Sequence, residues 1–224
     1  RNLSRGLGDV YKRQEQDALL GRNEKIFEPM IHFVNKAQYP KDSKNLEKVY
    51  FGMGCFWGAE KYMWEINGVV YTSVGYGDGF TKNPTYEEVC SGKTAHNEIV
   101  EVIFNPREIE FTKLLKAFWE NHDPTQGMRQ GYDIGTQYRS GIYVTNTNQM
   151  KLAEKTKQTY ETILTKNGFK PITTEIKEIK NFFFAEEYHQ QYLAKNPGGY
   201  CGHGGCGIKT VSYTHLTLPT RDEV

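Results

Sequence analysis

Cys55 stands in the run Gly54-Cys55-Phe56-Trp57-Gly58, directly before residues 59–66, which predict a helix. A helix start offers free backbone N–H groups and favours an anion, which for a cysteine is the nucleophilic thiolate. Phe56 and Trp57 add two aromatic rings beside the sulfur. The pattern therefore predicts a reactive cysteine in an apolar pocket, although by itself it also suits a small buried core residue.

Two further thiols, Cys201 and Cys206, lie in the glycine-rich stretch 198–207, which predicts a mobile arm. One thiol on a rigid element and two on a flexible arm indicate redox cycling. The rigid thiol would be oxidised by substrate, and a mobile thiol would resolve it as a disulfide. A zinc site made by Cys55, Cys201, Cys206 and His203 is the competing interpretation. We expect no metal, because four residues between two cysteine ligands is an uncommon spacing.

Three enzyme classes begin with a thiolate and differ in its partners. A protease needs a histidine base, for which the candidates by residue type are His96, His122 and His189. A sulfoxide reductase needs a proton donor for the departing oxygen, and here the candidates are Glu98, Tyr86 and Tyr138. A thiol peroxidase is the third possibility, and a non-catalytic zinc or redox-sensing module remains as a fourth.

The elements that must position these groups follow from periodicity and turn signals. Besides the strand before Cys55, the sequence predicts strands over 69–76, 98–104, 138–144 and 172–179, and helices over 86–90, 111–121, 146–166 and 185–195. Residues 122–137 predict a long glycine-containing loop, and such loops are often functional. This order of elements predicts one α+β domain with a mixed sheet and helices packed against it.

Composition narrows the class of protein. The chain has 224 residues, of which 38% are hydrophobic, and a formal net charge of +1, so nothing indicates binding to nucleic acid or to an anionic membrane. We find no apolar run that could cross a bilayer and no secretory signal. Four cysteines without a C-x-x-C pair favour reduced thiols and a cytoplasmic location.

The two ends of the chain look foreign to the rest. Residues 1–14 and 211–224 resemble translated adapters from sequencing-library preparation, and we leave them out of the fold prediction. We expect residues 15–47 to form an N-terminal arm and 48–210 to form the domain with its cysteine-bearing tail. On this interpretation the natural sequence on either side, including any further cysteine or fused domain after 210, is unknown.

Nearly all of residues 48–206 resembles the A-class peptide methionine sulfoxide reductases. The motifs that carry the resemblance occur in order at 54–58 with Glu60, 83–92, 96–98, 118–124, 129–131, 133, 135–140, 189–193, 196–197 and 199–202. The departures are Asp78, within Gly77-Asp78-Gly79 where a Gly-Gly pair is more usual, and Tyr132, where Asn is commoner. Neither departure falls on a matched catalytic position.

The resemblance implies roles for residues of the site. It implies a plait-type (ferredoxin-like) two-layer α/β sandwich in which Cys55 attacks the sulfoxide sulfur and Glu98 protonates the oxygen. Tyr86 and Tyr138 would donate hydrogen bonds to the same oxygen, with the Asp133 carboxylate beside them. Phe56 and Trp57 would form the walls around the S-methyl group of the substrate.

The resemblance also implies the rest of the cycle. Methionine leaves, Cys55 becomes a sulfenic acid, and Cys201 resolves it to a Cys55–Cys201 disulfide. Thioredoxin, or dithiothreitol in vitro, then restores the dithiol without any bound cofactor, and Cys206 is a candidate for a Cys201–Cys206 shuttle. The implied substrates are the S epimer of free methionine sulfoxide and oxidised proteins. We expect a monomeric oxidoreductase for protein repair.

Overall fold

The computed structural model describes residues 11–41, 44–200, 202 and 204–210. Its strands are β1 (Glu47–Met53), β2 (Val69–Gly77), β3 (Asn97–Phe104), β4 (Arg129–Gln130), β5 (Asp133–Ile134), β6 (Ser140–Val144), β7 (Glu175–Glu178) and β8 (Phe182–Phe184). Its helices are α1 (Phe56–Trp64), α2 (Tyr86–Cys90), α3 (Phe111–Glu120), α4 (Thr147–Lys166) and α5 (Tyr192–Lys195). The short 3₁₀ helices are η1 (Glu15–Asp17), η2 (Thr136–Tyr138) and η3 (Glu187–His189).

The main sheet has the strand order β7-β6-β1-β3-β2-β8. Its four inner strands pair antiparallel, with β3 inserted between β1 and β2, whereas the edge strand β7 joins β6 in parallel. Together with α1 and α3 these four strands form the βαββαβ unit of a ferredoxin-like plait. The predicted α+β class, mixed sheet and plait-type sandwich are therefore confirmed.

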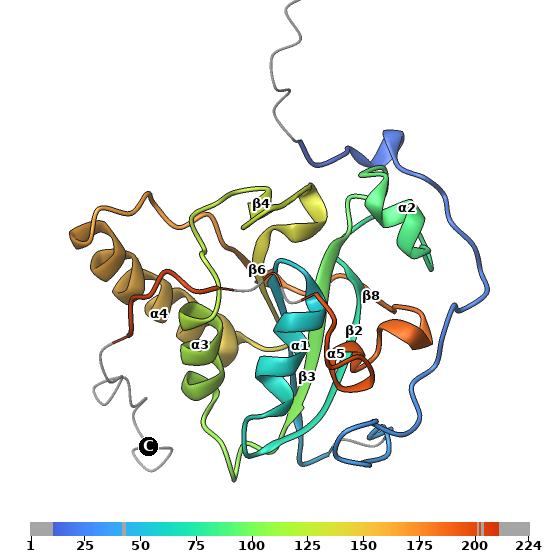
Figure 1. Ribbon diagram of the computed structural model, residues 1–224, viewed down its shortest axis with the longest axis horizontal. Helices are drawn as coiled ribbons and strands as arrows, with labels where there is room; N and C mark the ends of the chain where they lie inside the picture. The colour runs from blue at the N-terminus through green and yellow to red at the C-terminus, as the bar shows by residue number, and fades with distance from the viewer. Residues whose placement is uncertain (1–10, 42–43, 201, 203, 211–224) are drawn as a thin grey trace, which may run out of the picture.

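Helices α1, α3 and α4 cover one face of this sheet (Figure 1). The helix α3 shows why: all five members of its predicted apolar stripe are buried in the core, namely Phe111, Leu114, Leu115, Phe118 and Trp119. On the sheet, alternate residues of β1 such as Val49, Phe51 and Met53 face the same core. The helix that begins after Cys55 is thus fixed against the centre of the sheet.

The predicted helix over 185–195 is wrong in one respect, because it is broken. It consists of η3 and α5, and between them Gln191 adopts a left-handed conformation with φ of 47°. The edge strand β8 just before it was not predicted, and it pairs with β2 at Gly75–Gly77. After the break α5 packs against α1, and His189 at the end of η3 contacts Phe56 and Trp57 in the first turn of α1.

The predicted loop 122–137 contains regular structure. A two-residue hairpin forms from β4 and β5, and it is followed by η2. The sequence predicted that a strand begins at Tyr138. Instead Tyr138 ends η2, and strand β6 begins at Ser140. The phenol therefore projects from a tight turn next to Asp133 on β5, so one short segment carries both candidate groups.

The N-terminal arm and the end of the tail both lie against the domain. His32 of the arm is fully buried beside β2. At the other end Tyr160 of α4 donates a hydrogen bond to the carbonyl of Ile208 (3.0 Å), and Thr210 Oγ1 and N donate to Glu120 of α3. Residues 205–210 therefore lie along α3 and α4 in this structure.

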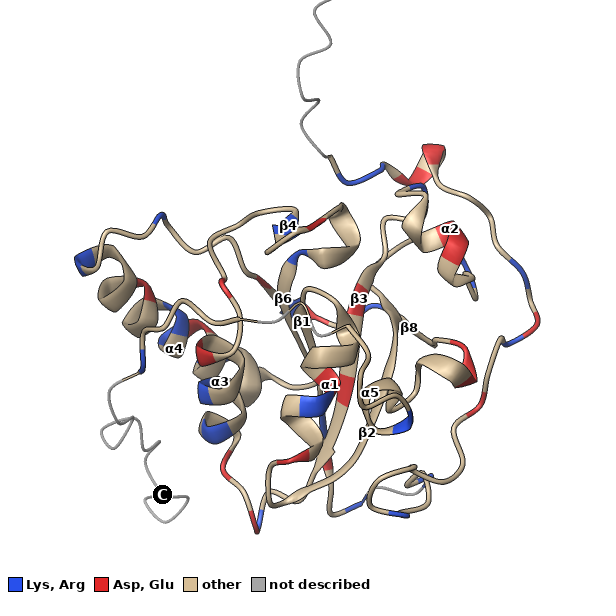
Figure 2. Ribbon diagram, in the orientation of Figure 1, with Lys and Arg blue, Asp and Glu red and all other residues tan. Residues whose placement is uncertain are grey.

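Charge and hydropathy add two general features. Basic and acidic residues are interspersed over the ribbon (Figure 2). Among the described residues, none of the helices is long and apolar enough to cross a bilayer.

Candidate active site

Cys55 is the N-cap residue of α1 and lies at the junction with β1. Its side chain is buried, with the residue 8% exposed. Gly54 before it has φ of +89°, and a Cβ placed there would lie 2.5 Å from Cβ of Gln130. Gln130 in turn is anchored by hydrogen bonds to the backbone of Asp123. The glycine therefore lets the 123–130 loop close over the turn that carries the thiol.

Glu98 lies on β3 and reaches the same helix start. Its Oε2 accepts a hydrogen bond from the backbone N–H of Phe56 at 3.2 Å, and the residue is 1% exposed. Burial raises the pKa of Glu98, the Phe56 N–H opposes the rise and the Asp133 carboxylate adds to it, so that the pKa lies at about 8. Glu98 therefore holds a proton at neutral pH, and it is hydrogen-bonded to the residue that follows the nucleophile.

The ionisation state of Cys55 differs from what its place at a helix start predicts. Burial raises the pKa of the Cys55 thiol, and the charges of Glu98 and Asp133 add to the rise. The backbone N–H groups of Trp57 and Gly58 lower the pKa but do not outweigh burial. In the unliganded protein Cys55 is thus a neutral thiol beside a protonated carboxyl group.

The two candidate phenols belong to the same electrostatic neighbourhood. Burial raises the pKa of Tyr138, and Glu98, Tyr86 and Asp133 contribute to the rise. Burial also raises the pKa of Tyr86, as does its side-chain hydrogen bond with Cys90, and Glu98 and Cys55 make smaller contributions. Both phenols therefore remain protonated and able to donate hydrogen bonds at neutral pH. Electrostatic interactions therefore connect Cys55, Glu98, Tyr86, Tyr138 and Asp133, which are five of the seven residues expected to take part in the chemistry.

Phe56 and Trp57 project from the first turn of α1 into an aromatic cluster. The indole Nε1 of Trp57 donates to Nδ1 of His189 at 3.0 Å. The ring of Tyr192 stacks on Trp57 with centroids 3.9 Å apart and an interplanar angle of 15°. Phe56 and Tyr86 contact the same imidazole ring, with centroid distances of 5.1 and 4.7 Å. His189 is therefore the centre of the wall beside the thiol.

The three histidines proposed as bases have other partners. His96 bonds to Gly79 and Thr81 through its two ring nitrogens, and His122 bonds to the Phe118 carbonyl and to Ser140. Burial lowers the pKa of His189 to about 4, so it is neutral, and its Nδ1 is an acceptor for Trp57. None of these bonds is the thiol–imidazole pair that a protease requires.

Some residues of the site had no assigned role in the sequence analysis. Glu186 accepts hydrogen bonds from the Tyr86 backbone N–H and from the Tyr76 hydroxyl, each at 2.9 Å, and so fixes the start of α2. Tyr192 supplies the ring stacked on Trp57. Residues 189–193 were recognised in the sequence as a motif, and this was the signal that could have identified Tyr192. The spacing of the motif alone did not indicate that its side chains form an aromatic wall.

The two tail cysteines differ in what the structure describes. Cys201 lies outside the described residues, as does His203 of the zinc alternative. Cys206 is half-buried, with its sulfur 3.9 Å from the His122 carbonyl oxygen. Burial and the neighbouring Asp123 raise the pKa of Cys206 to about 12. Among residues that the structure does describe, no group of three His, Cys, Asp or Glu side chains is placed to hold a metal.

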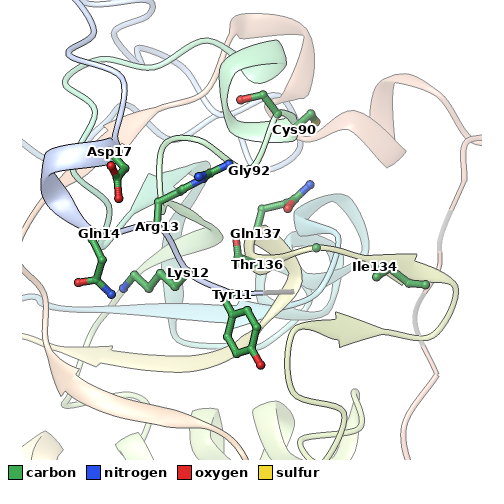
Figure 3. Close-up of a pocket in the computed structure, with 12 residues that line it drawn as sticks. Tyr11, Lys12, Arg13, Gln14, Asp17, Cys90, Gly92, Ile134, Thr136 and Gln137 are labelled. Carbon is green, nitrogen blue, oxygen red and sulfur yellow. The ribbon is translucent and has the colours of Figure 1, made fainter. Parts of the chain in front are cut away.

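A cavity of about 610 Å³ lies near, but not at, this site. It is bounded by residues 11–14, by the end of α2 with Cys90, and by Ile134–Gln137 on the segment that precedes Tyr138 (Figure 3). Cys55 and Glu98 do not line it. Because residues 11–14 belong to the end that we expect to be foreign, we assign the cavity no function.

Comparison with known proteins agrees with this geometry. The peptide methionine sulfoxide reductase family model matches residues 47–213. Peptide methionine sulfoxide reductase MsrA of Saccharophagus degradans is 57% identical over 195 residues, which cover 87% of this chain and 91% of the relative. The mitochondrial peptide methionine sulfoxide reductase of Rattus norvegicus is 54% identical over 208 residues, covering 91% of this chain and 89% of the relative.

A solved structure extends the similarity to the fold. Methionine sulfoxide reductase A of Corynebacterium diphtheriae superposes with a TM-score of 0.80 at 44% identity, covering 88% of this chain and 99% of that one. Sequence motifs, sheet topology and the surroundings of Cys55 therefore lead to one assignment. This chain belongs to the peptide methionine sulfoxide reductase family.

Proposed function

We propose that this protein reduces the S epimer of methionine sulfoxide, free and within proteins, to methionine, with Cys55 as the nucleophile. The observation that carries the proposal is the pair formed by a buried thiol and a buried carboxyl group that keeps its proton. Glu98 bonds to the N–H of the residue that follows Cys55, and its pKa is raised to about 8. A proton donor of that strength suits the protonation of a sulfoxide oxygen at neutral pH.

The first step transfers oxygen from the substrate to Cys55. Glu98 protonates the sulfoxide oxygen as the Cys55 sulfur attacks the sulfoxide sulfur, and the thiol proton replaces the one that Glu98 gives. The oxygen then moves to Cys55, which becomes a sulfenic acid, and methionine leaves with the electron pair. The substrate sulfur is reduced and the enzyme sulfur is oxidised by the same two electrons.

Tyr86 and Tyr138 stabilise the charge that develops on the oxygen during this step. Both phenols are neutral donors near Glu98, and donors aimed at developing charge give a large part of many rate enhancements. Asp133 raises the pKa of Glu98 and so helps to keep its proton in place. Phe56 and Trp57 form the apolar wall for the S-methyl group of the substrate.

Cys201 completes the reaction by attacking the sulfenic acid, with water as the leaving group and a Cys55–Cys201 disulfide as the product. The neighbours of Cys201 support this role. Burial raises the pKa of Asp133, and a side-chain hydrogen bond with Tyr200 opposes that rise. The Gly202 carbonyl oxygen lies 3.5 Å from the position of a Cβ on Gly131. The tail thus crosses the loop that carries Asp133.

Thioredoxin, or dithiothreitol in vitro, would restore the dithiol by thiol–disulfide exchange. We include a Cys201–Cys206 disulfide as a relay in this cycle. Burial and Asp123 raise the pKa of Cys206 to about 12, which disfavours the thiolate that the relay uses. Oxidised proteins and thioredoxin are then the partners of a monomeric enzyme that needs no bound cofactor or metal. A reducing compartment such as the cytoplasm suits this cycle.

The test is methionine release from each sulfoxide epimer with dithiothreitol as reductant. We expect turnover of the S epimer and no release by Cys55→Ser. Dithiothreitol can itself reduce a sulfenic acid, so Cys201→Ser is assayed with thioredoxin as the reductant. There it should release one methionine per enzyme, because it forms the sulfenic acid but no disulfide that thioredoxin can reduce. Peptide mapping of the oxidised wild type should show the Cys55–Cys201 pair. Sustained activity in Cys55→Ser would refute the mechanism, and peroxide-dependent thioredoxin oxidation without sulfoxide reduction would favour a thiol peroxidase.

A further inference from the structure

A second buried carboxyl group lies on the same helix as the nucleophile and takes no part in the chemistry proposed above. Glu60 of α1 is fully buried. Its Oε1 accepts hydrogen bonds from Thr72 Oγ1 at 3.0 Å and from Gln191 Nε2 at 2.7 Å. Its Oε2 accepts one from the backbone N–H of Gln191 at 2.8 Å. Two of the three bonds therefore go to one residue, 131 positions along the chain.

Every hydrogen bond of Glu60 runs in the same direction, from a donor to the carboxylate. Nδ1 of His32 accepts from the backbone N–H groups of Val34 and Asn35, so the ring proton is on Nε2 and is directed at Thr72 Oγ1, 2.9 Å away. The hydroxyl proton of Thr72 is then directed at Glu60. This chain of donors, which starts in the N-terminal arm, ends at the Glu60 carboxyl group, which in its ionised form can only accept. Burial raises the pKa of Glu60 to about 7, and the bonds from Gln191 and Thr72 oppose that rise.

Gln191 is the residue on which these bonds converge, and its backbone is strained. It has φ of 47°, in the left-handed region that residues other than glycine seldom adopt. The Glu60 carboxylate holds both its N–H and its side-chain amide. Removal of that carboxylate would take away the interactions that offset the strain.

The residues on either side of Gln191 hold Trp57. His189, two positions before it, accepts the indole N–H, and Tyr192, one position after it, stacks on the indole ring. Glu60 thus reaches Trp57 by two routes. One is along α1, where Trp57 and Glu60 are three positions apart, and the other passes through Gln191 to the two rings that fix the indole. Glu60 itself is buried beneath the wall and does not face the substrate.

We propose that Glu60 is a positioning residue that sets the orientation of Trp57 by fixing Gln191, and with it the width of the pocket for the S-alkyl group. The proposal rests on the function proposed above, in which Trp57 contacts the S-methyl group. A displaced indole would leave Cys55 and Glu98 in place but would relax the fit around the methyl group. The expected defect is therefore in discrimination between substrates rather than in the ability to reduce a sulfoxide.

The experiment compares kcat/KM for the S epimers of methionine sulfoxide and its S-ethyl homologue, ethionine sulfoxide. We expect the wild type to prefer the methyl substrate, and one methylene can give a preference of about 10–200-fold in kcat/KM. Glu60→Gln should lower that preference at least about fivefold. Gln191→Asn, which tolerates a left-handed backbone but has too short a side chain to reach Glu60, should lower it as well. This milder variant serves if Glu60→Gln does not fold.

Two further variants separate positioning from general loss of stability. Glu101→Gln is the matched control, because Glu101 is a buried carboxylate that accepts from Tyr50 and Ser73 and lies away from the aromatic wall. It should lower the unfolding temperature and leave the methyl preference unchanged. The double variant Glu60→Gln with Gln191→Glu restores a hydrogen bond between the two side chains but leaves the Thr72 hydroxyl without its acceptor, so it should recover part of the preference.

The outcomes distinguish this inference from the proposed function. If the wild type reduces neither sulfoxide, the proposed function is wrong. If the wild type is active and Glu60→Gln folds but keeps the methyl preference, the positioning role is wrong. The same conclusion follows if Glu101→Gln changes the preference as much as Glu60→Gln does, or if the exchanged pair recovers stability without recovering the preference.

Discussion

Glu98 combines two properties that a protein seldom combines without a functional reason. It is fully buried, and among the described residues it has a backbone N–H donor from Phe56 but no basic partner. A structural carboxylate in the core normally has an ion pair or several donors, as Glu101 has with Lys48, Tyr50 and Ser73. Glu98 is instead kept as a neutral acid, which is the form that can protonate an oxygen.

The first prediction concerns Glu98→Gln. We expect kcat for methionine release to fall at least about 100-fold, because the amide cannot donate a proton in the transition state. In the wild type the rate of single-turnover methionine release should fall as the pH rises above about 8, where Glu98 loses its proton. This alkaline decline should be absent from the residual activity of the variant. A variant with wild-type kcat would contradict the role as acid.

Unfolding experiments supply the control for this variant. The folded-state pKa of Glu98 is raised from 4.5 to about 8, so the protonated form is favoured by folding. Its contribution to stability is present below about pH 4.5 and is lost as the pH rises through 8. Glu98→Gln does not titrate, so its unfolding free energy relative to the wild type should increase between those values. A less stable variant at pH 9 would show that its low activity reflects damage to the fold.

At the scale of elements, the junction between β1 and α1 depends on how closely two chain segments approach. Gly54 has positive φ, and the Gln130 side chain occupies the space where a Cβ would be. Gln130 belongs to β4, the strand that starts the short hairpin carrying Asp133. The absence of a side chain at Gly54 thus lets the hairpin that carries the Asp133 carboxylate approach the turn that carries the Cys55 thiol.

The second prediction compares Gly54→Ala with Gly168→Ala. Both positions have a similar φ, +89° and +81°, so alanine should cost each of them about 1 kcal/mol or more in unfolding free energy. Only at Gly54 does the new Cβ meet another segment, since Gly168 has nothing within 4 Å. We expect kcat/KM to fall for Gly54→Ala and to be unchanged for Gly168→Ala. Equal effects on kcat/KM would show that the close approach of Gln130 does not matter to the site.

At the scale of the whole molecule, the sequence predicted what local periodicity determines. The stripe from Phe111 to Trp119 and the glycine-flanked turn at Cys55 were predicted because their signals lie within a few residues. The break at Gln191 was not, because the carboxylate that stabilises it is 131 residues away. The neutral thiol of Cys55 was also missed, since burial is a property of the assembled fold and outweighs the local effect of the helix start.

Movement of the tail also depends on distant parts of the molecule, because residues 205–210 are held by side chains of α3 and α4. Tyr160 of α4 donates to the Ile208 carbonyl at 3.0 Å, and Cys206 lies between this anchor and the residues near Asp133. Release of this segment from α3 and α4 would expose the Cys206 thiol and lower its raised pKa, which would favour the thiolate that the proposed Cys201–Cys206 relay uses.

The third prediction is therefore that Tyr160→Phe, which removes the bond and keeps the ring, speeds alkylation of Cys206 by iodoacetamide. The loss of about 1 kcal/mol should give an increase of about fivefold at fixed pH, followed by mass spectrometry of the Cys206 peptide. Single-turnover methionine release, for which Cys55 is the one cysteine required, should be unchanged. Tyr143→Phe is the control, because it removes a buried hydroxyl that bonds to Asn97 on the other face of the sheet. If both variants alkylate at the wild-type rate, residues 205–210 do not restrain Cys206, and recycling is limited by another step.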